Sequence, residues 1–416
     1  MLFIYDFIVQ IADFILKIIA VFIPKIKLFV EGRKAVFEIL EDKIKPNDKI
    51  IWFHAASLGE YEQGLPVIEK IKAKFKDHKI LISFFSPSGY EVRKNNLIAD
   101  ITIYLPLDTT KNVARFFELV QPEMAFFIKY EFWPNYLNAL KKRKTTTYLI
   151  SGIFRENQMF FKWYGGFYRD ALNAFTYFFV QNERSKALLL KLHKTNVAVS
   201  GDTRFDRVMS ILEKKNTLDF IEKFKNNCLT IVIGSSWPKD ENLLVTYINN
   251  CNGNIKFIIA PHNINTEQIA SLKKNITKKS VLFSDIGTDR NLSLQDFDVF
   301  IIDTIGMLTK IYSYADIAYV GGGFGNPGVH NLLEPATFGI PIVIGPNYSH
   351  FAEATALINL EGSISIKNLN ELNDAFLNLI SNDAIRNEKG HICSTFVQMN
   401  QGATAIILNQ ILKNYN

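Results

Sequence analysis

The sequence predicts an α/β protein with two doubly wound parallel sheets, preceded by a helix that associates with a membrane. Short apolar runs alternate with helical patterns in each half of the chain, which is typical of parallel sheets covered by helices on both faces. A charged, helix-prone stretch separates the halves, and the first 23 residues are almost entirely apolar. A length of 416 residues is enough for two or three domains.

We expect four segments along the chain. These are a helix in residues 1–30, an N-terminal domain in 31–206, a linker in 207–227 and a C-terminal domain in 228–416. Both domains are expected to be Rossmann-like, and the last helix of the chain can pack back on the N-terminal domain. Two such domains would face each other across a cleft, which is a common place for a ligand.

The N-terminal apolar segment carries one polar stripe. Asp6, Gln10, Asp13 and Lys17 are spaced four, three and four residues apart, so they share one face of a helix. The segment is long enough to span a bilayer, but aspartates facing lipid are costly. The stripe would therefore lie in water with the helix in the membrane interface, or dock on the protein. An ordinary buried first helix is the remaining alternative.

Composition narrows the function classes. The formal charge of +6 suits an anionic substrate or an anionic membrane surface, and the absence of a dense basic helix argues against nucleic acid. Three scattered cysteines fit a reducing compartment, and the dispersed histidines predict no metal site. The sequence has neither a GxxxxGK[ST] phosphate loop nor a GxSxG elbow.

Lysines and an arginine after Pro24 would keep the following domain on the cytoplasmic side of the membrane.

In the first half, the loops after the apolar runs carry the polar residues. The strand candidates are Ile50–His54, Ile80–Phe84, Met124–Ile128, Thr147–Ile150, Tyr177–Val180 and Val197–Ser200. Ligands of such sheets bind beyond the carboxyl ends of the strands. There, Ser57 and Glu60 follow the first run at the start of a helix, where Glu60 is either a general base or a helix cap.

Two more segments of the first half have compositions typical of a ligand-binding surface at the strand ends. Lys129 opens a stretch in which charged and aromatic residues and a proline directly follow an apolar strand. Residues 151–169 are rich in aromatic side chains and form either a surface for a lipid or buried helix packing. Arg204, in a turn at the end of this half, binds an anion or pairs with a nearby aspartate.

The second half repeats the alternation. Its strand candidates are Thr230–Ile233, Lys256–Ala260, Val281–Phe283, Val299–Ile302, Ile317–Val320, Ile342–Ile344 and Ser363–Ile366. Between the fifth and sixth of these, Gly321 to Pro346 reads as strand, glycine loop, short helix opening at His330 and Asn331, and strand. Backbone N–H groups of the loop and the helix start predict an anion site, and a carboxylate there, Glu334, predicts sugar hydroxyls.

We therefore predict a nucleotide-sugar pocket at the carboxyl edge of the second sheet. The candidate donor-binding residues are Ser235, His262, Thr304, Gly306, Gly322, Gly323, His330, Asn331 and Glu334. Thr304 or the aspartate before it is expected to cap a helix that starts there. No cofactor beyond the sugar nucleotide is expected.

These motifs, taken in order, resemble those of the 3-deoxy-D-manno-octulosonic acid (Kdo) transferases of lipopolysaccharide synthesis. They are HAASLGE at 54–60, YEFWPN at 130–135, GDTRFD at 201–206, DTIGML at 303–308, YADIAYVGGGF at 314–324 and HNLLEPATFGIPIVIGP at 330–346. The resemblance covers nearly the whole chain after about residue 30. The HNLLEP type of motif alone is shared by many two-domain glycosyltransferases.

The resemblance implies the GT-B fold, with the acceptor bound by the N-terminal domain and CMP-Kdo by the C-terminal one. It further implies a membrane anchor at the cytoplasmic face of the inner membrane, in contact with membrane lipids, and a lipid A precursor as acceptor. Glu60 matches the family's proposed catalytic base, and Glu131 matches a second glutamate of the family. Asn331 and Glu334 match residues expected near the nucleotide, with Glu334 at the ribose hydroxyls.

The departures from the family pattern fall mainly on the acceptor side. Lys129 and Tyr130 stand where Glu-Thr is usual, Arg204 stands for a lysine, and residues 151–155 differ. Ser57, Lys129 and Arg204 are our candidates for an acceptor or anion. Two other functions stay open: a sugar-nucleotide epimerase on the same fold, and a membrane-bound glycan-binding module without catalysis.

Overall fold

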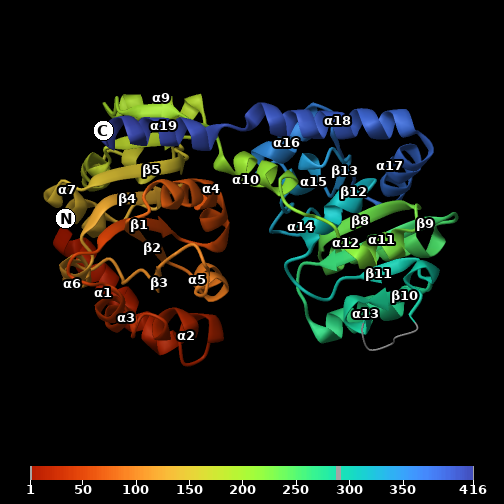
Figure 1. The fold of residues 1–416 in the computed structure, drawn as a ribbon, viewed down its shortest axis with the longest axis horizontal. Helices are drawn as coiled ribbons and strands as arrows, with labels where there is room; N and C mark the ends of the chain where they lie inside the picture. Colours follow the sequence, from red (N-terminus) through yellow and green to blue (C-terminus); the bar gives the residue numbers. More distant parts are fainter. Residues whose placement is uncertain (1, 287–291, 416) are drawn as a thin grey trace. The chain divides into compact units, whose positions relative to one another are not determined.

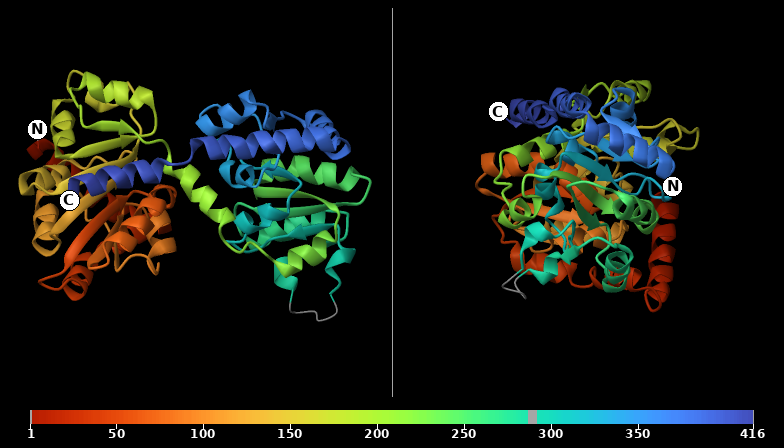
Figure 2. Two further views of the ribbon diagram at one scale, coloured as in Figure 1. Left: turned by 45° about the horizontal axis from the view of Figure 1, so that its top comes forward. Right: turned by 90° about the vertical axis from the view of Figure 1, so that its right-hand side faces the viewer.

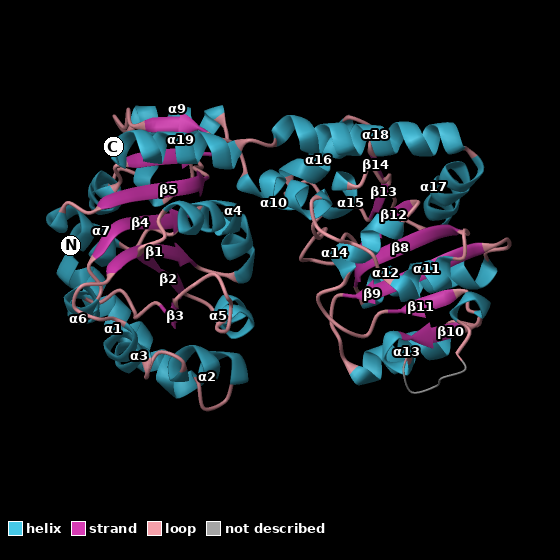
Figure 3. Cartoon of the chain, in the orientation of Figure 1, coloured by secondary structure: helices cyan, strands magenta, loops and turns pink. Residues whose placement is uncertain are grey.

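The computed structural model describes residues 2–286 and 292–415, which form two compact units. The first unit comprises residues 1–207 and 401–416, and the second comprises residues 208–400. Each unit is a sheet of seven parallel strands with helices packed on it (Figures 1 and 3). The two parallel-sheet α/β units are those predicted from the alternation of apolar runs and helical patterns.

The first sheet has the strand order β3-β2-β1-β4-β5-β6-β7. Its strands are β1 Lys49–Ala55, β2 His78–Phe84, β3 Ile101–Tyr104, β4 Pro122–Ile128, β5 Thr146–Gly152, β6 Tyr177–Val180 and β7 Val197–Val199. Strand β3 is an addition to the sequence prediction, because its four residues follow a polar stretch and are too few to show a clear period. Trp52 at the centre of β1 is fully buried among Phe116, Phe127 and Tyr136.

Helices cover both faces of this sheet. They are α1 Leu2–Ile19, α2 Pro24–Glu31, α3 Val36–Lys43, α4 Leu58–Lys74, α5 Pro87–Arg93, α6 Thr110–Leu119, α7 Pro134–Arg143, α8 Gly166–Ala171, α9 Glu183–Lys191, α10 Thr203–Leu212 and α19 Ala403–Tyr415. Side chains of α3, α6, α7 and α9 share one buried cluster with the strands, and those of α4 and α19 share another.

The C-terminal helix α19 therefore belongs to the first unit, where Figure 1 draws it in blue beside elements from the start of the chain. Its Ile407 and Ile411 are fully buried, and Tyr415 contacts Phe75 edge-on. Asp206 of α10 caps its start, since its carboxylate accepts hydrogen bonds from the backbone N–H groups of Gly402 and Thr404, at 2.6 and 2.7 Å.

The second sheet has the order β10-β11-β9-β8-β12-β13-β14. Figure 2 draws its strands, coloured green to blue, from two further sides. Its strands are β8 Leu229–Ser236, β9 Ile255–Pro261, β10 Ser280–Leu282, β11 Val299–Ile301, β12 Ile317–Val320, β13 Ile342–Ile344 and β14 Ser363–Ser365. Its helices are α11 Asp219–Lys225, α12 Pro238–Asn250, α13 Thr266–Asn275, α14 Leu308–Ile311, α15 Leu333–Thr337, α16 Ala352–Asn359, α17 Leu369–Ser381 and α18 Asp383–Asn400. The stretch 207–227, expected as a linker, contains most of α10 and all of α11, whose Phe224 packs on Phe300 of β11.

The N-terminal helix contacts the first unit through Tyr5 and Asp6, whereas Gln10 and Lys17 of the predicted polar stripe are exposed. Tyr5 donates a hydrogen bond to the Asp108 carboxylate at 2.8 Å, and Asp6 accepts one from the backbone N–H of Thr110 at 2.6 Å. The opposite side leaves Phe3, Phe7 and other apolar residues exposed. Among the described residues, no helix combines the length and the apolar character needed to cross a bilayer.

Candidate active site

The strand order reverses near the centre of each sheet. In the first sheet the reversal lies between β1 and β4, and in the second it lies between β8 and β12. Loops that leave the carboxyl ends of two such strands diverge to opposite faces, which opens a crevice for a ligand. The residues predicted from the strand-end motifs lie mainly in the loops that follow these four strands.

Glu60 lies in the first turn of α4, immediately after β1. Its carboxylate accepts hydrogen bonds from the backbone N–H groups of Ala56 at 2.6 Å and Ser57 at 3.2 Å, so Glu60 does cap the start of the helix. Only 5% of the residue is exposed. Burial, followed by the charge of Glu131, raises the pKa of Glu60 to about 7, against the lowering effect of these N–H groups and of Lys129.

Glu131, after β4, is joined to β1 through a buried aromatic network. Its Oε2 lies 3.0 Å from the indole Nε1 of Trp133 and 3.3 Å from Nε2 of His54, which is fully buried. The Trp133 N–H also points to His54 Nε2, at 2.9 Å. On its other side, His54 Nδ1 lies 3.1 Å from the carbonyl oxygen of Ser83. Glu131 is thereby fixed at the same crevice as Glu60.

Lys129 is the first residue after β4 and adopts the left-handed conformation, with φ of 71°. This conformation is uncommon for a residue with a side chain and is concentrated at functional sites. Its ammonium group lies 5.0 Å from the ring centre of Tyr130, and its charge lowers the pKa of Glu60. The lysine that replaces the family's glutamate thus acts directly on the electrostatics of Glu60.

The other two acceptor-side candidates have structural partners. Ser57 is the residue that precedes α4, in an extended conformation, and its backbone N–H is held by Glu60. Arg204 pairs with the buried carboxylate of Asp202 at 2.8 Å, so the aspartate alternative is the one that the structure contains. Asp202 in turn accepts a hydrogen bond from Gln63 of α4 at 2.7 Å.

In the second unit, the glycine loop after β12 is needed for close packing. A Cβ atom on Gly323 would lie 2.7 Å from the backbone of Gly345, and one on Gly321 would lie 2.4 Å from the carbonyl oxygen of Ser235. Gly322 has a φ of +95°, which favours glycine. Ser235 itself is left-handed, with φ of 53°. The loops after β8, β12 and β13 therefore meet backbone to backbone.

Asp240 holds this loop in place and was missed by the sequence reasoning. It lies in the first turn of α12, is fully buried, and accepts hydrogen bonds from Tyr319 Oη at 2.9 Å, the Gly322 N–H at 2.8 Å and the Trp237 N–H at 3.0 Å. The Gly322 N–H, which we expected to face an anion, is consequently satisfied by the protein. The signal in the sequence was an aspartate two residues after Pro238, which is typical of the first turn of a helix capped by a carboxylate.

His262, after β9, stacks on the Trp237 ring and lies tilted against that of His330. Its ring centre is 4.7 Å from that of Trp237 and 4.3 Å from that of His330, and Trp237 donates a hydrogen bond from Nε1 to Nε2 of His330 at 2.8 Å. Burial, and then the proximity of His262, lowers the pKa of His330 to about 4. Burial also lowers the pKa of His262. Both predicted histidines are therefore neutral at pH 7.

The helix after the glycine loop starts later than predicted. Helix α15 begins at Leu333, so His330 and Asn331 precede it and only Glu334 lies in its first turn. With five residues it is too short to supply the strong positive end that we expected. Glu334 accepts hydrogen bonds from Asn331 Nδ2 at 3.0 Å and from the hydroxyl of Thr309 at 2.8 Å. Thr309 was not predicted.

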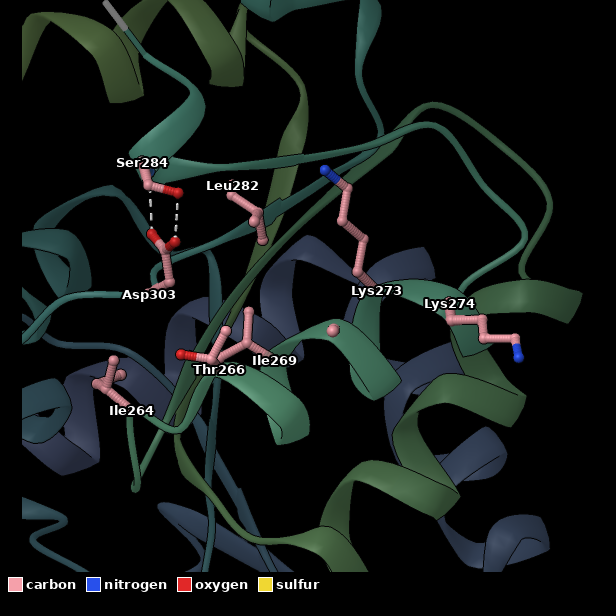
Figure 4. Close-up of a pocket in the computed structure, with 9 residues that line it drawn as sticks. Ile264, Thr266, Ile269, Lys273, Lys274, Leu282, Ser284 and Asp303 are labelled. Atoms are coloured by element: carbon pink, nitrogen blue, oxygen red, sulfur yellow. Dashed lines mark hydrogen bonds between the residues drawn. The ribbon is translucent and has the colours of Figure 1, made fainter. Parts of the chain in front are cut away.

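Thr304 and Gly306 lie in the loop after β11, and the expected helix cap at Thr304 is wrong because α14 starts at Leu308. Next to them, Asp303 borders a cavity of about 520 Å³ at the carboxyl ends of β9, β10 and β11. Figure 4 shows both oxygens of Asp303 facing Ser284, which donates from its backbone N–H at 3.0 Å and from its hydroxyl at 2.5 Å. Ile264, Ile269 and Leu282 give this cavity an apolar wall.

Among residues 2–286 and 292–415, no group of three or more histidine, cysteine, aspartate or glutamate side chains is arranged to hold a metal ion. The three cysteines are free thiols. The candidate site consists of two crevices: one in the first unit, with Glu60, Glu131 and Lys129, and one in the second, with the histidines and Glu334.

Known proteins are similar to this chain in sequence and in fold. Residues 31–207 match the family model of 3-deoxy-D-manno-octulosonic-acid transferase (kdotransferase). A 3-deoxy-D-manno-octulosonic acid transferase of Chlamydophila psittaci is 27% identical over 345 residues, which is 78% of this chain and 77% of the relative. The transferase of Aquifex aeolicus is 26% identical and covers 83% of this chain and 91% of its own length. The chain is therefore similar to Kdo transferases over most of its length.

Solved structures of other proteins are similar to this chain in fold. The UDP-GlcNAc 2-epimerase of Neisseria meningitidis bound to UDP-GlcNAc matches 88% of the chain and 100% of its own, with a TM-score of 0.60 and 16% identity. MurG of Acinetobacter baumannii matches 88% and 99%, with a TM-score of 0.56 and 12% identity. The two parallel-sheet units are thus those of GT-B-like proteins, as the family resemblance implied.

Proposed function

We propose that this chain is an inverting glycosyltransferase that moves Kdo from CMP-Kdo to a lipid A precursor, with Glu60 as the general base. The observation that carries the proposal is the buried Glu60 carboxylate at the crevice of the first sheet, with a pKa of about 7. A general base works best when its pKa is close to the pH at which it acts. The similarity to Kdo transferases is the reason for naming Kdo as the transferred sugar.

In the proposed reaction, Glu60 takes the proton of an acceptor hydroxyl while the hydroxyl oxygen attacks the anomeric carbon of Kdo. The bond from that carbon to the phosphate oxygen of CMP breaks, and CMP leaves with the electron pair. A direct displacement of this kind inverts the anomeric carbon. Lys129 keeps enough of Glu60 ionised near neutral pH, because its charge opposes the effects of burial and of Glu131.

The second unit is proposed to hold the donor. Neutral His330 and His262, Asn331 and Glu334 surround the carboxyl ends of β8 and β12, where a nucleotide would lie in a doubly wound sheet. Glu334 is suited to accept hydrogen bonds from ribose hydroxyls. The Asn331 amide and the Thr309 hydroxyl, which both donate to Glu334, fix the direction of its carboxylate.

We further propose that helix α1 attaches the protein to the cytoplasmic face of the inner membrane, where a lipid acceptor is found. Its Tyr5 and Asp6 contact Asp108 and Thr110 of the first unit, while Phe3 and Phe14 are 84% and 66% exposed. A helix docked in this way can insert its apolar side into the membrane interface without spanning the bilayer.

Transfer is tested with purified protein, CMP-Kdo and a tetraacyl lipid A precursor. Mass spectrometry should find the acceptor extended by Kdo, together with an equal amount of CMP. An epimerised free sugar without an extended acceptor would favour the epimerase, whose likeness to this chain concerns the fold alone. Binding of acceptor without release of CMP would favour a non-catalytic glycan-binding module.

A further inference from the structure

Each unit pairs a tryptophan with a histidine across the two strands at which its sheet order reverses, although the two residue types are interchanged between those strands. In the first unit, the Trp133 indole N–H lies 2.9 Å from His54 Nε2, and in the second, the Trp237 indole N–H lies 2.8 Å from His330 Nε2. In the first unit, His54 Nε2 also lies 3.3 Å from an acceptor, Oε2 of Glu131. In the second unit, the indole nitrogen of Trp237 is a donor only, so Nε2 of His330 has to be the acceptor. In a neutral imidazole the proton must then be on Nδ1.

The two pairs differ in what lies on the other side of the ring. His54 is fully buried, and its Nδ1 is used by the protein, 3.1 Å from the carbonyl oxygen of Ser83. His330 is only half-buried, and within the described residues no protein acceptor faces its Nδ1. Nδ1 of His54 is therefore already used by the protein, whereas Nδ1 of His330 carries an N–H that is free to donate to a ligand.

His330 is held firmly enough to aim that donor. Its backbone N–H donates to the carbonyl oxygen of Gly321 at 3.1 Å, and its Cδ2 lies so close to Gly322 that a Cβ there would be 2.9 Å away. The His262 ring lies tilted against that of His330, with ring centres 4.3 Å apart, and the backbone N–H of Trp237 donates to the buried carboxylate of Asp240.

We propose that Trp237 is a positioning residue that fixes His330 as the neutral Nδ1–H tautomer, so that His330 donates one hydrogen bond to a phosphate oxygen of the sugar nucleotide. The proposal deepens the donor site and rests on the proposed function for the identity of the nucleotide. A fixed neutral donor stabilises the charge that builds on the leaving phosphate without having to lose or reorient a proton during the reaction.

The groups that bear on this ring favour the neutral form. Burial is the larger cause of the lowered pKa of His330, and the proximity of His262, at the end of β9, is the second. With a pKa of about 4, His330 would keep its single donor and its acceptor throughout the neutral range. A protonated ring would lose the hydrogen bond from Trp237, because both nitrogens would then be donors.

The tautomer is tested by ¹⁵N NMR of the full chain labelled at histidine, with His330→Gln to assign the signal. We expect an Nδ1–H imidazole for His330 in the wild type at pH 7, and loss of that single tautomer in Trp237→Phe, which keeps a stacking ring but removes the N–H. Trp133→Phe is the matched control, and it should alter the signal of His54 and leave that of His330 unchanged. An Nε2–H tautomer in the wild type, or an unchanged one in Trp237→Phe, would overturn the proposal.

Titration with CMP separates this proposal from the proposed function. Saturating CMP should shift the His330 Nδ1 signal, and Trp237→Phe should lower kcat of Kdo transfer by about 10-fold, less than the roughly 10²-fold loss expected when the donor itself is removed in His330→Gln. CMP that binds by calorimetry but leaves Nδ1 unshifted would overturn the phosphate role of His330. Failure of CMP to bind at all, with the Nδ1–H tautomer intact, would count against the proposed donor and not against the Trp237–His330 pair.

Discussion

Glu131 lies close enough to Glu60 for its negative charge to raise the pKa of the Glu60 carboxyl, although the two residues follow different strands of the sheet. The ammonium group of Lys129 acts in the opposite direction. The readiness of Glu60 to take up a proton therefore depends on two side chains of the loop after β4. Three groups with opposed effects make the pH dependence of this site predictable.

The pH profile should move in opposite directions in two variants. If Glu60 must be ionised to act, kcat rises with pH through about 7 in the wild type. Glu131→Gln removes a neighbouring negative charge and should move this inflection to lower pH, while Lys129→Met should move it to higher pH. Rates of CMP release from pH 5 to 9 provide the measurement, and shifts of the same sign in both variants would refute the assignment.

Glu60→Gln should abolish most of the transfer while keeping the fold. Glutamine still offers an oxygen to the N–H groups of Ala56 and Ser57, so the start of α4 stays capped. Loss of a general base costs about 10²–10⁴ in rate. Glu69→Gln, on the exposed side of the same helix, is the control and should keep wild-type activity. Near-wild-type turnover in Glu60→Gln would exclude it as the base.

Glu60→Gln should also change how the free energy of unfolding depends on pH. The pKa of Glu60 is raised in the folded state, so the folded state binds a proton more tightly than the unfolded chain does. Glu60 therefore makes stability fall as pH rises from its ordinary carboxyl range to about 7, by up to about 3 kcal/mol. Glu60→Gln should lose this fall and be more stable than the wild type above pH 7, as measured by urea unfolding at several pH values.

Asp206→Ala should loosen the C-terminal helix from the first unit. The change leaves the N–H groups of Gly402 and Thr404 without their acceptor at the start of α19, which costs about 0.5–2 kcal/mol. Asp206→Asn, which retains one oxygen, should cost less. Glu118→Ala, at an exposed position of α6, is the control. Equal free energies of unfolding for Asp206→Ala and the control would contradict the capping role.

Gly323→Ala should disrupt the meeting of the loops in the second unit. The added Cβ would lie 2.7 Å from backbone atoms of Gly345, which cannot move away as a side chain can. Overpacking of this kind costs about 1–3 kcal/mol. Gly59→Ala, where the Cβ meets open space, should change the free energy of unfolding by less than about 1 kcal/mol. CMP affinity should fall in Gly323→Ala as well, by calorimetry.

The sequence predicted what depends on local pattern and left out what depends on burial. Strands β12 and β13 were expected at Ile317–Val320 and Ile342–Ile344 and have these bounds, because each is a short, continuous apolar run. Asp240 looked like an ordinary acidic residue in the first turn of a helix, and only the packing of α12 against the sheet shows that its carboxylate is buried under the glycine loop.

Similarly, the pairing of Trp237 with His330 joins residues from the loops after β8 and β12, and no sequence spacing encodes it. The start of α15 was misplaced because His330 and Asn331 have no strong preference against a helix, whereas the packing of Gly322 on the His330 ring holds this segment out of one. For Glu60 the motif was sufficient to select the residue, but the cause of its raised pKa lies in burial.

The exposed side of α1 should govern attachment to lipid. Phe7→Glu and Phe14→Glu each replace an exposed aromatic side chain on the face opposite Tyr5 and Asp6. Each buried aromatic contributes about 1.5–3 kcal/mol, so either change should weaken binding to anionic phospholipid vesicles by at least about 10-fold in a sedimentation assay. Leu97→Glu, at an even more exposed apolar site outside α1, should bind like the wild type. If all three variants bind equally, another surface attaches the protein, whereas loss with Leu97→Glu alone would move the membrane contact away from the N-terminal helix.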